Sequence, residues 1–314
     1  MLILFVYFTI ISIINNFLLF PFLLLSKKLN SKLYLYFANI YLFGLSFIIK
    51  YFHQSKLYIK NKHLFDENIN KLIIQNHQSE FDYFFGYMLF FINNLSFNLK
   101  MIISYHVYYL LPGIGLYNML LDSILIKFNK TDINTLDKLK IKNNDIIYLY
   151  PEGDVIHKKT KEKSDNYCLK NNIEKTKNVL YPKTTGLEII IKNNNIKYIY
   201  ALCTHYDDFS PNDINHKIFT TSIPKKIYID IQKYEINDIK ETTVQIFRNI
   251  DESFNNKNYD DYKLINLTLK EFLCFLFNII LFIFGIYLLY NYHIVKFYFL
   301  IQFISYYVYL YFFI

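Results

Sequence analysis

Apolar residues are concentrated at the two ends of this chain, and that distribution limits what it can fold into. Residues 1–26 carry no charge, and Leu33–Ile49 is a second apolar run. The first run is long for a signal peptide and has no basic segment before it. The second has 17 residues, near the lower limit for crossing a bilayer, so it either spans or only embeds. The sequence therefore predicts membrane-embedded helices over residues 1–50.

The C-terminal end repeats this pattern. Phe272–Tyr292 and Phe297–Ile314 are uncharged runs of 21 and 18 residues, separated by His293 and Lys296. Hydrophobic residues make up 53% of the 314 residues, and because they gather at the ends they indicate membrane helices rather than an oversized soluble core. We therefore expect a transmembrane helical hairpin within residues 264–314.

Charge and cysteine content limit the possible partners. The formal net charge is +8, which favours anionic lipid head groups or a polyphosphate substrate. Nucleic acid is not expected as a partner, because no nucleic-acid-binding motif accompanies the charge. The three cysteines, Cys168, Cys203 and Cys274, are far apart, so neither a disulfide framework nor a metal site is predicted.

The central region, residues 51–263, alternates β-branched or aromatic runs with helical patterns. Predicted strands are followed by helical stretches, an alternation typical of an α/β domain with a mixed sheet and surrounding helices. The strands that we expect are Lys71–Ile74, Asp145–Tyr150, Ile196–Tyr206 and Lys226–Gln232, and the helices are Phe81–Phe91, Leu187–Lys192 and Thr242–Phe254. The Lys-rich segment Ile156–Val179 is expected to be a loop with a short helix.

A histidine and an aspartate stand five positions apart where the strand Lys71–Ile74 runs into the helix Phe81–Phe91. At this spacing the Asp82 carboxylate can contact the His77 imidazole, orient it and stabilise its protonated form. Such a pair is the base and orienting half of a catalytic triad, without a nucleophile. It suits activation of a hydroxyl that arrives with the substrate. The alternative, from spacing alone, is a pair of residues that cap a helix.

Two later segments have the composition of ligand-binding turns. In Tyr150-Pro151-Glu152-Gly153-Asp154, an acidic residue beside glycine ends a predicted strand, which is where α/β sheets bind ligands. Glycine also lets the backbone approach a ligand closely. Pro182-Lys183-Thr184-Thr185-Gly186 precedes a predicted helix and has a lysine suited to a phosphate. Taken singly, each segment is also an ordinary turn.

Together these residues resemble the lysophosphatidic acid acyltransferase superfamily of glycerolipid acyltransferases. That family has a His-x4-Asp box, a Gly…Arg block, a Pro-Glu-Gly-Thr block and a Pro-containing block, in this order. His77 and Asp82 match the first box, Pro151–Gly153 match the third, and Pro182–Gly186 resemble the fourth. The resemblance covers about residues 65–255. It is greatest to the eukaryotic branch that includes lysocardiolipin and lysophosphatidylinositol acyltransferases.

The resemblance implies the glycerolipid acyltransferase fold, flanked by the membrane helices. It implies transfer of an acyl group from acyl-CoA to the free hydroxyl of a lysophospholipid, at the endoplasmic reticulum membrane, in phospholipid synthesis or remodelling. Acyl-CoA is a co-substrate, and no cofactor is expected. The implied roles are His77 as general base, Asp82 as its orienting carboxylate, and substrate binding by Lys127, Glu152, Gly153, Pro182 and Lys183.

Three departures from the family pattern concern the phosphate site. Lys127 stands where the family has arginine, which keeps the charge but loses the bidentate fork. Asp154 replaces the usual threonine, and Tyr105 replaces a lysine. A less basic site leaves other acceptors open, such as glycerol 3-phosphate or a lysocardiolipin. It also leaves open the alternative of a catalytically inactive lipid-binding membrane protein.

Overall fold

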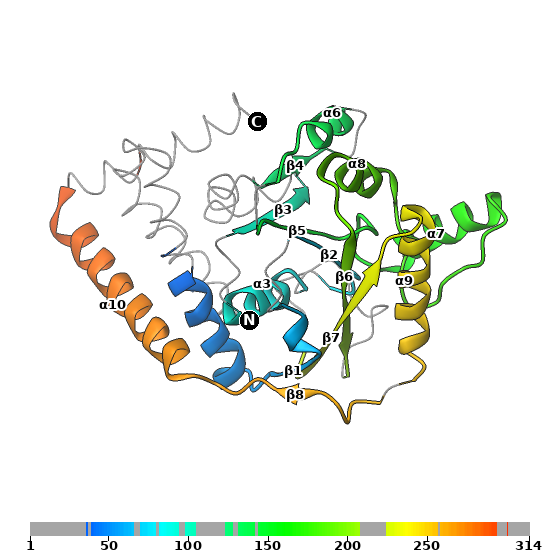
Figure 1. Cartoon of the computed structure of the whole chain (residues 1–314). Coiled ribbons are helices and arrows are strands. Elements are labelled where there is room, and N and C mark those ends of the chain that lie inside the picture. Colours follow the sequence, from blue (N-terminus) through cyan, green and yellow to red (C-terminus); the bar gives the residue numbers. More distant parts are fainter. Residues whose placement is uncertain are drawn as a thin grey trace.

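The computed structural model describes residues 36, 39–65, 70–79, 82–93, 98–104, 123–127, 131–141, 144–207, 224–256, 258–293 and 300. Within this part of the chain, eight strands form one mixed sheet in the order β4-β3-β5-β2-β6-β7-β1-β8 (Figure 1). The strands from β4 to β6 run parallel, whereas β6–β7 and β1–β8 are antiparallel pairs. The strands are β1 Lys56–Lys60, β2 Lys71–Gln75, β3 Leu99–Ser104, β4 Ile124–Ile126, β5 Ile146–Leu149, β6 Tyr198–Tyr206, β7 Lys226–Glu235 and β8 Lys263–Leu264.

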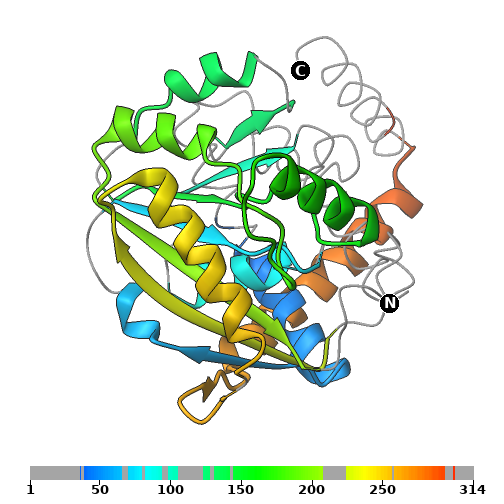
Figure 2. The same ribbon diagram turned by 90° about the vertical axis from the view of Figure 1, so that its right-hand side faces the viewer.

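Helices cover both faces of the sheet (Figures 1 and 2). On one face, the helix Asn39–Phe52 and α3 (Asp82–Ile92) share a core with residues of β1, β2, β5, β6 and β7. On the other, α6 (Thr131–Asp137), α8 (Thr185–Asn194) and α9 (Ile239–Ser253) pack over a second core. The central strands β2 and β5 are buried along their whole length, as expected for parallel strands covered on both sides. The helix Asn39–Phe52 ends in η2 (Ile48–Phe52), and the other described helices are η3 Lys62–Phe65, α7 Lys158–Lys170 and α10 Leu269–Asn291.

The predicted fold class is confirmed, with changes at the ends of elements. Each of the four predicted strands is present, and β7 continues three residues further than expected, to Glu235. The segment 156–179, expected to be a loop with a short helix, contains the 13-residue helix α7. The strands β1 and β3 were not predicted, because short apolar runs do not by themselves distinguish a strand from a buried helix.

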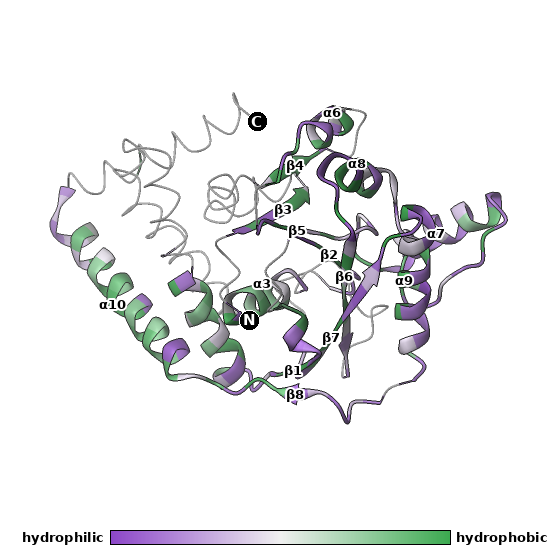
Figure 3. Cartoon of the chain, in the orientation of Figure 1, coloured by the Kyte–Doolittle hydropathy of each residue, from purple (hydrophilic) through white to green (hydrophobic). Residues whose placement is uncertain are grey.

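α10 is the one described helix that is long and apolar enough to cross a membrane. It covers the predicted run Phe272–Tyr292 and is green along most of its length in Figure 3, whereas α7 and α9 are largely purple. Its capping box, in which Thr268 and Glu271 exchange hydrogen bonds, fixes where the helix begins. The predicted apolar run 1–26 lies outside the described residues, and of the predicted run Phe297–Ile314 only residue 300 is described.

Candidate active site

The predicted histidine and aspartate meet at the carboxyl end of β2. His77 Nδ1 lies 3.0 Å from Asp82 Oδ2, which also accepts the Ser79 backbone N–H at 2.8 Å. Asp82 is completely buried at the first residue of α3, while the His77 side chain keeps 18% of its surface exposed. A carboxylate on Nδ1 fixes the tautomer and leaves Nε2 as the basic nitrogen. The pair therefore has the geometry of an oriented general base.

Asn76 fixes the backbone just before the histidine. Its side-chain amide donates to the Thr204 carbonyl at 3.0 Å and accepts the Thr204 N–H at 2.8 Å. The parallel β2–β6 ladder ends at the pair Gln75 and Leu202, so this amide continues the ladder in place of a backbone group. On the other side, the His77 carbonyl accepts the Ile156 N–H at 3.0 Å. The position of His77 is thus set by β6 and by the segment after β5.

Glu152 connects the turn after β5 to the histidine box and to the segment just before Pro182. It is 2% exposed, and its two oxygens accept the backbone N–H groups of His77 and Leu180. Burial raises its pKa to about 8, and the two backbone hydrogen bonds oppose that shift. Glu152 was predicted to bind substrate, and in this structure both of its carboxylate oxygens accept hydrogen bonds from the protein backbone. These contacts orient the histidine box and the segment before Pro182.

Gly153 and Lys183 lie against each other. Gly153 has a φ of +72°, a left-handed conformation that glycine adopts without steric cost. A Cβ at this position would lie 2.8 Å from Lys183 Nζ. The Lys183 N–H donates to the Pro151 carbonyl at 2.9 Å, next to the buried Pro182. The third and fourth blocks therefore form one surface, with an exposed lysine above a glycine turn.

Lys127 follows β4 and is exposed. Because the strands from β4 to β2 are parallel, it lies on the same edge of the sheet as His77. It is three strand positions from β2 in the sheet order, which corresponds to about 14 Å at the usual strand spacing. The structure thus places Lys127 at the β4 end of this edge, which we call the rim, apart from the cluster of His77, Glu152 and Lys183. Tyr105 lies outside the described residues.

Three tyrosines surround the dyad and were not predicted as site residues. The Tyr150 ring stacks on the His77 imidazole, with centroids 4.2 Å apart and an interplanar angle of 21°. The hydroxyls of Tyr148 and Tyr150 are 2.5 Å apart, and Tyr148 donates to the Gln75 side chain. Tyr206, at the end of β6, donates to Asp82. In a chain with 31 tyrosines, composition does not single these three out.

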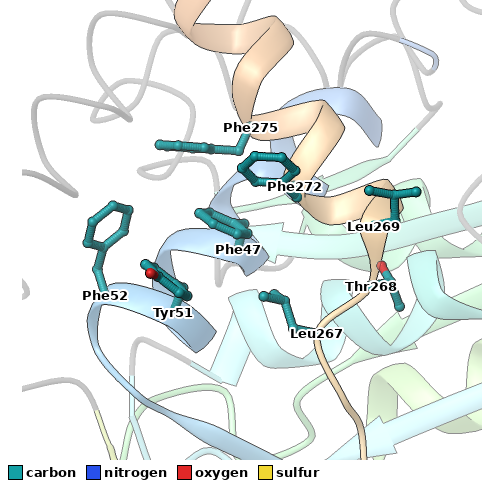
Figure 4. A pocket seen from close by; sticks show the side chains of 8 residues that line it. All are labelled: Phe47, Tyr51, Phe52, Leu267, Thr268, Leu269, Phe272 and Phe275. Atoms are coloured by element: carbon teal, nitrogen blue, oxygen red, sulfur yellow. The ribbon is translucent and has the colours of Figure 1, made fainter.

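An apolar groove lies between the helix Asn39–Phe52 and the beginning of α10 (Figure 4). Its volume is about 450 Å³. The labelled side chains come from both helices and from the segment before α10, and most are aromatic. They are Phe47, Tyr51, Phe52, Leu267, Thr268, Leu269, Phe272 and Phe275. The predicted catalytic residues are not among them, so the groove is a separate feature of the helical side of the molecule.

Comparison with known proteins connects this geometry to a family. A family model described as Acyltransferase matches residues 56–196, which include every predicted site residue. Lysocardiolipin acyltransferase 1 of Gallus gallus is 28% identical over 97 residues, 30% of this chain and 25% of that protein. Residues 56–196 form an acyltransferase domain that is similar to those of the lysophosphatidic acid acyltransferase superfamily. This confirms the family resemblance drawn from His77, Asp82 and the later blocks.

Two further proteins extend the comparison. An uncharacterized acyltransferase of Saccharomyces cerevisiae is 26% identical over 216 residues, 57% of this chain and 54% of that protein. The chain thus spans from a quarter to about half of these curated relatives. The crystal structure of the 1-acyl-sn-glycerophosphate acyltransferase PlsC from Thermotoga maritima aligns with a TM-score of 0.50 and 18% identity, over 81% of this chain and 95% of that chain. That likeness supports the fold.

Proposed function

We propose that this protein transfers an acyl group from an acyl-CoA to the free hydroxyl of a lysophospholipid. The observation that carries the proposal is the buried Asp82 carboxylate at 3.0 Å from His77 Nδ1, on a partly exposed histidine at the carboxyl edge of an acyltransferase domain. A partly exposed histidine that a buried carboxylate orients suits the activation of a substrate hydroxyl for direct attack.

In the proposed reaction, His77 Nε2 takes the proton of the acceptor hydroxyl as its oxygen attacks the thioester carbonyl carbon. The carbon–sulfur bond breaks, and the coenzyme A thiolate takes the proton back from the imidazolium. Asp82 holds the ring and offsets its transient positive charge. The Tyr150 ring, stacked on the imidazole, stabilises the same cation by a cation–π interaction. Lys183 and, at the rim, Lys127 are the proposed phosphate ligands.

The bilayer is the proposed source of the acceptor. α10 has exposed apolar side chains along its length, among them Leu269, Ile280 and Ile283. Exposed apolar surface of this extent is typical of a membrane contact. A helix of about 20 apolar residues also has the length required to span the hydrocarbon core. We propose integral association with the endoplasmic reticulum membrane, where both the lysolipid and the product would reside.

The test is acyl transfer by the purified full chain in lipid nanodiscs. Oleoyl-CoA is supplied with a panel of lysophosphatidic acid, lysophosphatidylinositol and monolysocardiolipin, and lipid products are measured by mass spectrometry. His77→Ala is expected to lower turnover by at least about 10²-fold, whereas His63→Ala, at an exposed histidine, is expected to leave it unchanged. A folded wild-type protein that acylates no member of the panel would contradict the proposal and favour a lipid-binding role.

A further inference from the structure

The second oxygen of the Asp82 carboxylate has its own donor, the hydroxyl of Tyr206. His77 and the Ser79 backbone occupy Oδ2, and Tyr206 occupies Oδ1. We infer that Tyr206 is a positioning residue of the catalytic dyad, which holds the Asp82 carboxylate in the orientation that aligns His77. This inference rests on the proposed function and adds a residue outside the segment 56–196 that the family model matches.

The environment of the pair makes this contact strong. Asp82 is completely buried and Tyr206 is 6% exposed, so water does not compete for the carboxylate oxygen. Burial raises the pKa of Tyr206 well above its usual range, and the neighbouring Asp82 charge adds to the shift. The hydroxyl therefore stays protonated and acts as a donor at every pH at which the enzyme would work. Hydrogen bonds to a charged group are about twice as strong as neutral ones.

Contacts of β6 restrict the position of the Tyr206 hydroxyl. Thr204, two residues earlier, is joined to the Asn76 side chain by the pair of hydrogen bonds described above. The Tyr206 ring lies against Phe85 of α3, with centroids 6.0 Å apart. The strand is thus fixed to the residue before His77, and the ring is fixed to the helix that begins with Asp82.

β6 also supports the other side of the imidazole. The Thr204 hydroxyl accepts from Gln75 Nε2 at 2.8 Å, and Gln75 Oε1 accepts the Tyr148 hydroxyl. Tyr148 in turn contacts Tyr150, which stacks on His77. The contacts that run from Tyr206 through Asp82, His77 and the two tyrosines are hydrogen bonds except for the His77–Tyr150 ring stack, and they return to the same strand. A substitution of Tyr206, at the end of β6, is therefore expected to change kcat by altering the His77–Asp82 pair.

The experiment compares kcat and KM of Tyr206→Phe with wild type and with Tyr200→Phe. Tyr200 is also buried in β6, but it packs beside Lys71 and Lys233. Loss of one hydrogen bond to the carboxylate is expected to lower kcat about tenfold and to leave both KM values within about twofold, since Tyr206 contacts neither substrate in the proposed reaction. Tyr200→Phe is expected to match wild type in kcat.

A double-mutant cycle separates positioning from a general structural effect. In the Asp82→Ala background, Tyr206→Phe is expected to have no further effect on kcat, because residues that act as one unit are not additive. A loss that persists in that background overturns the inference, as does wild-type kcat in Tyr206→Phe. A Tyr206→Phe protein that fails to fold also overturns it, because a hydroxyl that acts only on the dyad is not required for folding. An inactive wild-type protein would instead refute the proposed function.

Discussion

Replacement of Glu152 by glutamine tests whether this residue orients the backbone of the histidine box. Both of its oxygens accept backbone N–H groups, from His77 and from Leu180. Glutamine keeps one acceptor and presents an NH₂ group to the other donor, so one buried N–H loses its partner. The cost of such a group is about 1–3 kcal/mol. Because one of the two donors is the backbone of His77, we expect Glu152→Gln to lower kcat by about tenfold or more.

The same substitution has a predicted signature in the pH dependence of stability. Burial raises the pKa of Glu152 to about 8 from 4.5, so between these values the native state holds a proton that the unfolded chain releases. The stability associated with this group is complete below pH 4.5 and is lost as the pH rises through 8. The difference corresponds to about 5 kcal/mol at 1.36 kcal/mol for each pKa unit. Glutamine does not titrate and contributes no such slope.

Thermal midpoints measured from pH 4.5 to 8.5 would check this prediction. The chain has no tryptophan, so unfolding is followed by the circular dichroism of its helices, a signal that does not depend on a titrating reagent. Relative to Glu152→Gln, the wild-type midpoint is expected to fall by about 8 °C across this range, from about 5 kcal/mol and an unfolding entropy of about 2.1 cal/mol/K per residue. Glu162→Gln, at an exposed position of α7, should follow the wild type. If wild type and Glu152→Gln change in parallel, Glu152 is not the titrating group and the argument from its burial is refuted.

Two further substitutions test the dyad and the rim. Asp82→Asn should leave the KM for both substrates nearly unchanged and lower kcat by at least about 10²-fold, because an amide does not offset the imidazolium charge; a change confined to KM would contradict this role. Lys127→Ala should raise the KM for the lysolipid and not for acyl-CoA, with exposed Lys138→Ala as the control. An unchanged KM for every acceptor would remove Lys127 from the phosphate site.

The sequence predicted the parts of this site that are local in the chain. His77 and Asp82 are five residues apart, and Gly153 follows Glu152 directly, so spacing and strand ends marked them as candidates and the family resemblance gave them their roles. The donor to the other oxygen of Asp82 is 124 residues away, and no local pattern identifies it. The role of Glu152 was likewise not predicted, since its contacts with His77 and Leu180 depend on how β2 and β5 pair.

The fold shows the same division between local and tertiary information. The buried strand β5 is a continuous apolar run, and β2 has three apolar residues between Lys71 and Gln75, so both were recognisable as strands. For α7 only a short helix was expected, because its sequence from Lys158 to Lys170 is almost entirely polar and buries only Thr160 and Cys168. A helix without an apolar stripe has no hydrophobic period to detect. Tertiary contacts, such as the Lys161 side chain on the Thr176 carbonyl at 2.5 Å, hold it in place.

Buried polar contacts join α10 to the helix Asn39–Phe52, and these contacts fix the position of α10 relative to the active site. Lys50 Nζ lies 2.8 Å from Glu271 Oε1, and their side chains are 6% and 1% exposed. Ser46 donates to the same carboxylate, and Asn278 donates to the Ile40 carbonyl at 3.1 Å. A buried charge without its partner is strongly destabilising, so these contacts favour one packing of α10 on the helix Asn39–Phe52. Because that helix shares a core with α3, which begins at Asp82, the apolar surface of α10 is held at a fixed position relative to the dyad.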